Sequence, residues 1–155
     1  MNRRKSNNPS RLIVGCGYLG QRVARRWLQS GSTVFATTRS EANAQLLAAA
    51  DIHPIIGDVT AADGSPASIR NLPEVDTVLW AVGFDRDANA SYYDVHVGGL
   101  LRILEQTPNN PRIIFISSTG VWGNETTDDV NESTPASPTR EAGQVLLEAE
   151  ATLGK

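Results

Sequence analysis

A glycine-rich segment near the start of the chain constrains the fold more than any other feature. The segment "RLIVGCGYLGQRVARRW", residues 11–27, places Gly15, Gly17 and Gly20 in the spacing G-x-G-x-x-G directly after a short apolar run. A continuous apolar run of this length is typical of a strand buried on both faces of a parallel sheet. The apolar residues after the glycines recur at helical spacing, so the glycines join a strand to a helix. This unit predicts an α/β fold.

The rest of the chain continues the alternation of strand and helix. Further strands are expected at 33–38, 53–58, 76–83 and 112–118, and further helices at about 40–50, 90–106 and 139–153. Ser40 and Gly31 are expected to cap helices. The polar segment 124–138 is expected to be a loop. The alternation predicts one doubly wound, mostly parallel sheet over residues 11–155, after a flexible tail at residues 1–10.

Two of these helices have a predicted buried stripe. The stripe of the helix at 90–106 is expected to contain Tyr93, Val97, Leu101 and Leu104. The stripe of the last helix is expected to contain Ala142, Leu146, Ala149 and Leu153. In each case the spacing of three or four residues places the side chains on one helical face.

Composition limits the possible partners. The chain has 155 residues, 40% of them hydrophobic, and a net charge of -3, which argues against nucleic acid as a general partner. The charge is uneven, because all eight basic residues before Glu41 precede the first acid, whereas seven acids and two bases follow Val121. A basic first third favours an anionic ligand. Solvated helix faces and a basic tail explain the same side chains equally well.

Other classes of protein are excluded more simply. Cys16 is the one cysteine, so no internal disulfide forms, and its place between two glycines predicts a packing role. The histidines and the cysteine have no metal-ligand spacing. The basic N-terminus is not followed by the apolar core of a secretory signal, and no apolar run reaches the length of a membrane span. We therefore expect a cytoplasmic protein with no metal and no membrane contact.

The glycine spacing, in its strand–helix context, predicts a site for a dinucleotide cofactor. The first glycine permits a tight turn, the second lets backbone amides approach a pyrophosphate, and the third lets the helix pack against the strand. The helix N-terminus adds free N–H groups and a positive dipole. No G-K-[ST] follows, so a P-loop is excluded. The predicted cofactor-binding segment contains Gly15, Gly17, Tyr18, Leu19 and Gly20.

The end of the second strand bears on which dinucleotide binds. An NAD-binding fold places an acid about twenty residues after the loop, where it binds the ribose 2′-hydroxyl. This chain has "TTRS" there, residues 37–40, with no acid. A guanidinium beside hydroxyl groups suits a 2′-phosphate, so we predict NADP with Arg39 as its ligand. The alternative is NAD, with Arg39 in a solvated turn and Glu41 reaching the ribose.

Several segments together resemble a known family. They are "VGCGYLGQRVA", "GDV" at residues 57–59, "YYDVHVGGLLRIL", "FISSTGVWG" and "NESTP", which extend over nearly the whole chain. The chain resembles the extended short-chain dehydrogenase/reductase superfamily, in its NAD-dependent epimerase/dehydratase branch. The pieces "TTRS" and "LLEAE" are most similar to the atypical members. The resemblance implies a Rossmann fold, a nicotinamide dinucleotide and a small-molecule substrate of unknown identity.

The resemblance also implies roles for residues outside the glycine loop. Asp58 and Val59 would lie near the adenine, and Ser118 matches the serine that orients the substrate. The other implied cofactor contacts are Ala81, Val82 and Gly83, along the ribose and nicotinamide path, and Ser117. Strand-end packing or capping is the alternative role for each of these residues. His96 replaces the asparagine of an N-V-x-G segment and is expected to be a buried, hydrogen-bonded residue.

Two departures from the family pattern limit the expected chemistry. The family's base is a tyrosine followed four residues later by a lysine on one helical face, and the lysine lowers the tyrosine's pKa. This chain has Arg140 and Gln144 at those positions, and an arginine stays protonated. The family is also about twice as long, so we expect this chain to lack the family's C-terminal substrate lobe and to expose a sheet edge. An exposed edge predicts self-association.

Two functions are therefore consistent with the sequence. The first is an NADP-dependent oxidoreductase or epimerase-like enzyme with an unusual proton donor. The second is a non-catalytic module that binds or senses the cofactor. The glycine loop supports both functions, the region around Ser118 favours the first, and Arg140 and Gln144 favour the second.

Overall fold

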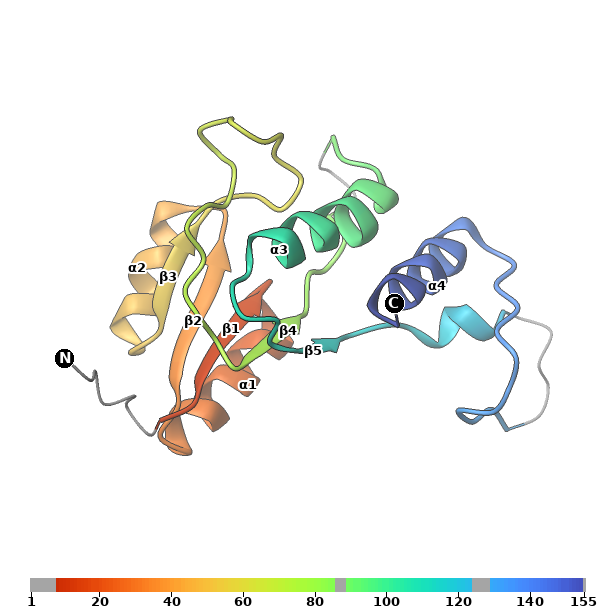
Figure 1. Ribbon diagram of the computed structural model, residues 1–155, viewed down its shortest axis with the longest axis horizontal. Coiled ribbons are helices and arrows are strands. Elements are labelled where there is room, and N and C mark those ends of the chain that lie inside the picture. The colour runs from red at the N-terminus through yellow and green to blue at the C-terminus, as the bar shows by residue number, and fades with distance from the viewer. Residues whose placement is uncertain (1–7, 86–88, 124–128, 155) are drawn as a thin grey trace.

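A computed structural model describes residues 8–85, 89–123 and 129–154. Strands and helices alternate along the chain as predicted, except that the fourth strand follows the third with no helix between them (Figure 1). In order they are β1 (Ser10–Val14), α1 (Tyr18–Gln29), β2 (Thr33–Thr38), α2 (Glu41–Ala49), β3 (His53–Ile56), β4 (Thr77–Trp80), the π-helix η1 (Asp94–Gly99), α3 (Leu100–Gln106), β5 (Arg112–Phe115), the 3-10 helix η2 (Thr119–Trp122) and α4 (Glu141–Leu153).

The five strands form one parallel sheet in the order β3-β2-β1-β4-β5. The chain winds outward from β1 in both directions, which confirms the prediction of a doubly wound sheet. Near its carboxyl end β1 lies between its two neighbours, with Ile13 beside Ala36 of β2 and Val14 beside Trp80 of β4. In folds of this type the order reverses beside the first strand, and ligands bind in the crevice at the carboxyl ends there.

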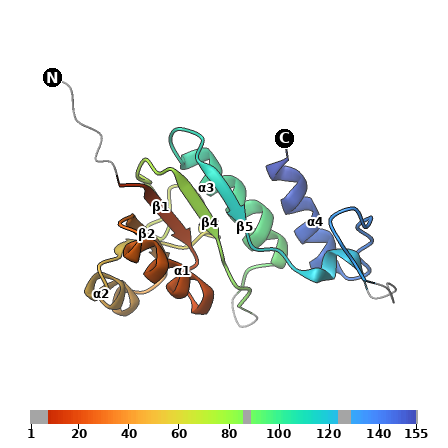
Figure 2. The ribbon, with the colours of Figure 1, turned by 90° about the horizontal axis from the view of Figure 1, so that it is seen from below.

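Helices cover both faces of the sheet, and alternate side chains of β1 serve two separate cores (Figures 1 and 2). Leu12 and Val14 pack with Trp80 in the core that also contains residues of α3 and α4. Ile13 packs with Ala36 in the core that also contains residues of α1 and α2. Because both faces of β1 are buried, its sequence is a continuous apolar run rather than an alternating one.

The outer side of β5 has no strand partner in the part of the chain that the structure describes (Figure 2). The helix α4 packs against η1 and η2 instead of extending the sheet. Ile116, just after β5, and Leu101 of α3 are exposed. An exposed edge was expected from the sequence, and self-association through it stays a prediction. Within the described ranges, no helix is long and apolar enough to cross a membrane.

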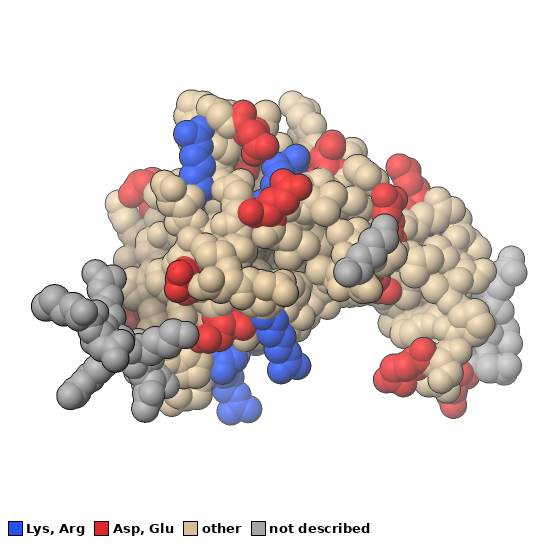
Figure 3. All heavy atoms as spheres, viewed as in Figure 1, with Lys and Arg blue, Asp and Glu red and all other residues tan. Residues whose placement is uncertain are grey.

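Charge is distributed along the fold as the sequence indicates. On the face shown in Figure 3, the Lys and Arg side chains lie over the part of the molecule that contains the sheet, with Asp and Glu side chains among them. The end formed by α4 and the segment before it shows Asp and Glu side chains on that face.

The helix predicted over 90–106 differs from expectation in two ways. It begins at residue 92, and after two residues it continues as the π-helix η1 before α3. A π-helical turn contains an extra residue, so the face that points to the sheet shifts along the sequence. Tyr93 and Leu101, which were expected in the buried stripe, are 45% and 39% exposed, whereas Leu100 and Ile103 are buried. The predicted stripe was therefore wrong at two of its four positions.

His96 lies within η1 and is buried, as predicted. Neither ring nitrogen has a hydrogen-bond partner among the described residues, so the expectation of a hydrogen-bonded histidine was wrong. Its ring instead contacts the ring of Tyr92, with 4.4 Å between centroids. Burial lowers the pKa of His96, because an apolar setting penalises the charged imidazolium.

The last helix also differs from its prediction. It begins at Glu141, two residues later than expected, and Arg140 precedes it in an extended conformation. A glutamate suits the positive N-terminal end of a helix dipole, and an arginine does not. Ala142 is exposed, so the predicted stripe was wrong there, whereas Leu146 and Ala149 are buried as expected. Residues 129–138 contain no helix or strand, in agreement with the predicted loop, whose residues 124–128 lie outside the described ranges.

Candidate functional site

Three glycines shape the loop between β1 and α1 in different ways. Gly15 has a φ of +89°, and a Cβ there would lie 2.7 Å from the carbonyl oxygen of Ala81. A Cβ on Gly20 would lie 2.7 Å from the carbonyl oxygen of Gly15. A Cβ on Gly17, by contrast, would meet no atom within 4 Å. Packing therefore requires the first and third glycines, whereas the second faces open space.

The N-terminus of α1 is open to an anion. Gly17 is its N-cap, no side chain caps it, and its first turn contains no acid. The next helix, α2, is different, because the Ser40 hydroxyl accepts a hydrogen bond of 3.2 Å from the Asn43 amide, as predicted. The loop itself is fixed by the Gly15 amide, which donates a 3.1 Å hydrogen bond to the Thr37 hydroxyl. Uncapped amides and the positive end of the helix dipole are the features that bind phosphate groups.

A cavity of about 760 Å³ lies beside this loop. Its size is within the usual range for sites that hold small molecules and cofactors. Eight of the residues predicted to bind cofactor line it, namely Gly15, Gly17, Arg39, Asp58, Val59, Ala81, Val82 and Gly83. The structure thus brings together residues from the ends of four strands at the crevice where a ligand is expected.

The cavity also has walls that the sequence did not indicate. These residues include Gln21, Arg25, Asn43, Thr60 and Asp85. Thr37, Thr38 and Ser40 also line the cavity, and the sequence indicated them as the hydroxyl groups beside Arg39. One signal was available for two of them, since Gln21 and Arg25 are four residues apart and share a face of α1. Asp85 has no comparable signal, because it follows a different strand from its partner Arg39.

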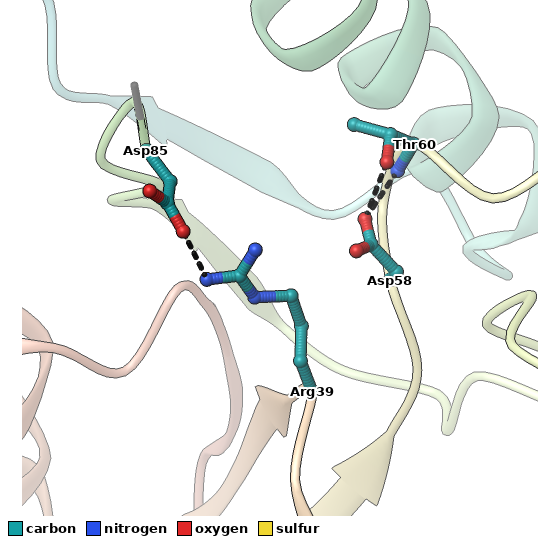
Figure 4. Close-up of polar contacts among 4 residues, drawn as sticks. All are labelled: Arg39, Asp58, Thr60 and Asp85. Atoms are coloured by element: carbon teal, nitrogen blue, oxygen red, sulfur yellow. Dashed lines mark hydrogen bonds and ion pairs between the residues drawn. The ribbon is translucent and has the colours of Figure 1, made fainter. Parts of the chain in front are cut away.

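Arg39 is paired rather than merely solvated. Its Nη2 lies 3.0 Å from Oδ2 of Asp85, and the two residues are 46 positions apart (Figure 4). The side chains are 59% and 43% exposed, so the ion pair is open to water. An exposed pair of this kind is weak and exchanges readily with other charged groups.

Asp58 combines two of the roles expected for it. Its Oδ1 accepts hydrogen bonds from the amide of Thr60 at 2.8 Å and from the Thr60 hydroxyl at 2.7 Å (Figure 4). This local turn fixes the carboxylate where the chain leaves β3. The same residue lines the cavity. The capping role therefore does not remove Asp58 from the site.

Seven predicted site residues do not line the cavity. Tyr18, Leu19 and Gly20 form the first turn of α1, and the others lie beyond β5; the full set is Tyr18, Leu19, Gly20, Ser117, Ser118, Arg140 and Gln144. Tyr18 is 78% exposed. The Ser118 hydroxyl caps η2 by accepting a 3.2 Å hydrogen bond from the Gly120 amide. The Ser117 hydroxyl is buried and has no hydrogen-bond partner among the described residues.

Neither Tyr92 nor Tyr93 has the lowered pKa that is expected of the family's catalytic tyrosine. Arg140 and Gln144 are exposed, and the backbone N–H of Gln144 donates a 3.1 Å hydrogen bond to the backbone carbonyl of Arg140. The Tyr93 hydroxyl donates a 3.2 Å hydrogen bond to Oε1 of Glu148, and that carboxylate raises the pKa of Tyr93. Burial raises the pKa of Tyr92. Both phenols therefore stay protonated at neutral pH, so neither is poised to act as a general base.

Two further features bear on the chemistry of the site. Burial raises the pKa of the Cys16 thiol, which packs against the core beside α1 and also lines the cavity. A protonated thiol is a poor nucleophile, in keeping with the predicted packing role. Among the described residues, no group of three or more His, Cys, Asp or Glu side chains could hold a metal ion.

Comparison with solved structures shows where this chain belongs. It is 32% identical to a protein from Methylobacillus flagellatus named as an NAD-dependent epimerase/dehydratase, with a TM-score of 0.67, over 94% of this chain and 50% of that one. A short-chain dehydrogenase/reductase superfamily protein from Agrobacterium tumefaciens with bound NAD is 22% identical, with a TM-score of 0.71, over 93% and 44%. The UDP-Glc/GlcNAc 4-epimerase from Campylobacter jejuni is 19% identical, with a TM-score of 0.77, over 95% and 48%.

These relatives are longer than this chain, which spans about half their length. The last two likenesses concern the fold alone. No curated protein sequence matches the chain at a significant level. The model of the NAD dependent epimerase/dehydratase family matches residues 12–143, which include the glycine loop and the start of α4. The chain therefore belongs to the NAD-dependent epimerase/dehydratase family.

Proposed function

We propose that this chain binds NADP(H) in the cavity beside the glycine loop and forms the cofactor-binding half of an epimerase/dehydratase-type oxidoreductase. One observation carries the proposal. Packing excludes a side chain at Gly15 and Gly20, whereas the space next to Gly17 is open and continues into the cavity. A loop fixed on both sides and free in the middle fits a pyrophosphate, whose oxygens accept hydrogen bonds from backbone amides.

The residues that line the cavity fit the parts of such a cofactor. The uncapped N-terminus of α1 would hold the pyrophosphate, and Asp58 with Val59 would border the adenine. Ala81 to Gly83 would border the ribose and nicotinamide, and Arg39 would face a 2′-phosphate. When bound, the nicotinamide supplies hydride transfer, and the protein's part is to hold and orient it. A small-molecule substrate and a cytoplasmic location complete the proposal.

A second candidate function is a non-catalytic module that binds or senses the dinucleotide. The observation that favours it is the state of the residues at the family's catalytic positions. Arg140 and Gln144 do not line the cavity, and the hydrogen bond to Gly120 already engages Ser118. Both functions share the cofactor site, so they differ only in whether the chain turns over a substrate.

Replacing Gly17 by alanine tests the shared cofactor site. The added methyl group meets no protein atom within 4 Å, so we expect the melting temperature to change little. The same methyl group occupies the space proposed for the pyrophosphate, so NADPH binding should weaken at least about tenfold, as calorimetry would measure. Gly98→Ala is the matched control, because it adds a methyl group outside the cavity. Unchanged affinity in a folded Gly17→Ala protein would contradict the proposed site.

Replacing Arg39 by alanine tests the preference for NADP. A charge-assisted contact to phosphate contributes about 1.5 kcal/mol, so NADPH binding should weaken roughly tenfold. NADH binding should change by less than about twofold, because NADH has no 2′-phosphate. Arg26→Ala removes the same charge at an exposed position outside the cavity and serves as the control. Equal losses for the two cofactors would show that Arg39 does not recognise the 2′-phosphate.

A measurement of substrate turnover distinguishes an enzyme from a non-catalytic binding module. We expect no appreciable NADP-linked turnover of sugar nucleotides, alcohols or ketones by this chain, because neither a guanidinium, at Arg140, nor a carboxamide, at Gln144, can accept a proton as a general base. The absorbance of the reduced nicotinamide measures this directly. Turnover that disappears in Arg140→Ala or Gln144→Ala would overturn the expectation. Turnover that depends on Tyr92, Tyr93 or His96 would establish an enzyme with a relocated proton donor.

A further inference from the structure

The ion pair between Arg39 and Asp85 crosses the cofactor crevice. Arg39 directly follows β2, and Asp85 follows β4 by five residues. The strand β1 lies between β2 and β4 in the sheet, so a bond from Arg39 to Asp85 passes over the carboxyl end of β1. That end carries the glycine loop. Figure 4 shows the Arg39 side chain extended toward Asp85, away from Asp58.

Both members of the pair also line the cavity, together with Gly15 and Gly17. The guanidinium that is proposed to face a 2′-phosphate is thus already bound to a carboxylate of this chain, at 3.0 Å. Carboxylates and phosphates are recognised by the same planar N–H groups of arginine. The Asp85 carboxylate therefore occupies the position beside the Arg39 guanidinium that a 2′-phosphate is proposed to take.

We propose that Asp85 is a specificity-determining residue that opposes binding of a 2′-phosphorylated dinucleotide by competing for Arg39. This inference rests on the proposed cofactor site. NADP(H) must displace the carboxylate from the guanidinium and then tolerates a negative charge close to its own 2′-phosphate. NAD(H) has only hydroxyl groups at that ribose, so it binds without breaking the ion pair.

The exposure of the pair supports exchange rather than a fixed structural role. A salt bridge whose side chains are 59% and 43% exposed contributes little to folding, so its loss does not threaten the fold. Arg39 and Asp85 therefore have opposite effects on the affinity for a 2′-phosphorylated dinucleotide. Arg39 attracts a 2′-phosphate, and Asp85 reduces that attraction.

Replacing Asp85 by asparagine tests the inference, because it keeps the shape of the side chain and removes its charge. In calorimetric titrations we expect Asp85→Asn to bind NADP+ about three- to tenfold more tightly and to bind NAD+ within about twofold of the parent protein. In an Arg39→Ala background, the gain for NADP+ should shrink to the part that comes from charge repulsion alone. Asp63→Asn makes the same change of net charge at an exposed position outside the cavity. It should leave both affinities unchanged.

The outcomes separate this inference from the proposed function. If Asp85→Asn changes NAD+ and NADP+ binding equally, or if its gain is the same size in the Arg39→Ala background, competition for Arg39 is overturned while the cofactor site stands. A gain as large in Asp63→Asn would likewise overturn it, since net charge would then explain the effect. Failure of all these proteins to bind either dinucleotide would overturn the cofactor site together with the inference.

Discussion

The backbone of the glycine loop lies against the backbone that follows β4, and this contact leaves no space for a side chain at Gly15. The carbonyl oxygen of Gly15 in turn lies close to Gly20 of α1, so the helix begins directly at the end of the sheet. Three elements therefore meet without side chains between them. Their close approach places the uncapped N-terminus of α1 at the mouth of the crevice beside β1, where the cavity is located.

The described residues include the groups needed to bind a cofactor, but the positions of the family's acid–base pair hold other residues. The cavity contains amides, a carboxylate with a fixed orientation and a guanidinium, which are the groups needed to recognise a charged nucleotide. The positions that match the family's acid–base pair hold Arg140 and Gln144 instead. The nearby phenols of Tyr92 and Tyr93 have raised pKa values, opposite to the shift that a lysine would cause. Cofactor binding is therefore the part of the proposed function that these groups support most directly.

The main features of the fold could be predicted from the sequence because they depend on local patterns. Short apolar runs identified the strands, and the glycine spacing located the loop. The phase of the helix after Ala90 could not be predicted, because a π-helical turn leaves no mark in the apolar periodicity. The start of α4 was misplaced by two residues, since helix ends depend on capping and dipole effects that periodicity does not report. The ion pair of Arg39 with Asp85 depends on the order of strands in the sheet, which brings together residues 46 positions apart.

Binding of a nicotinamide dinucleotide to the loop between β1 and α1 is the proposal on which the others depend. The most direct measurement follows backbone amide resonances by NMR while NADP+ or NAD+ is added to the isotopically labelled protein. We expect the largest shifts at the amides of residues 15–20 and 81–83, with small shifts in α4. Large shifts confined to α4 or to the β5 edge, or no shifts at saturating dinucleotide, would contradict it.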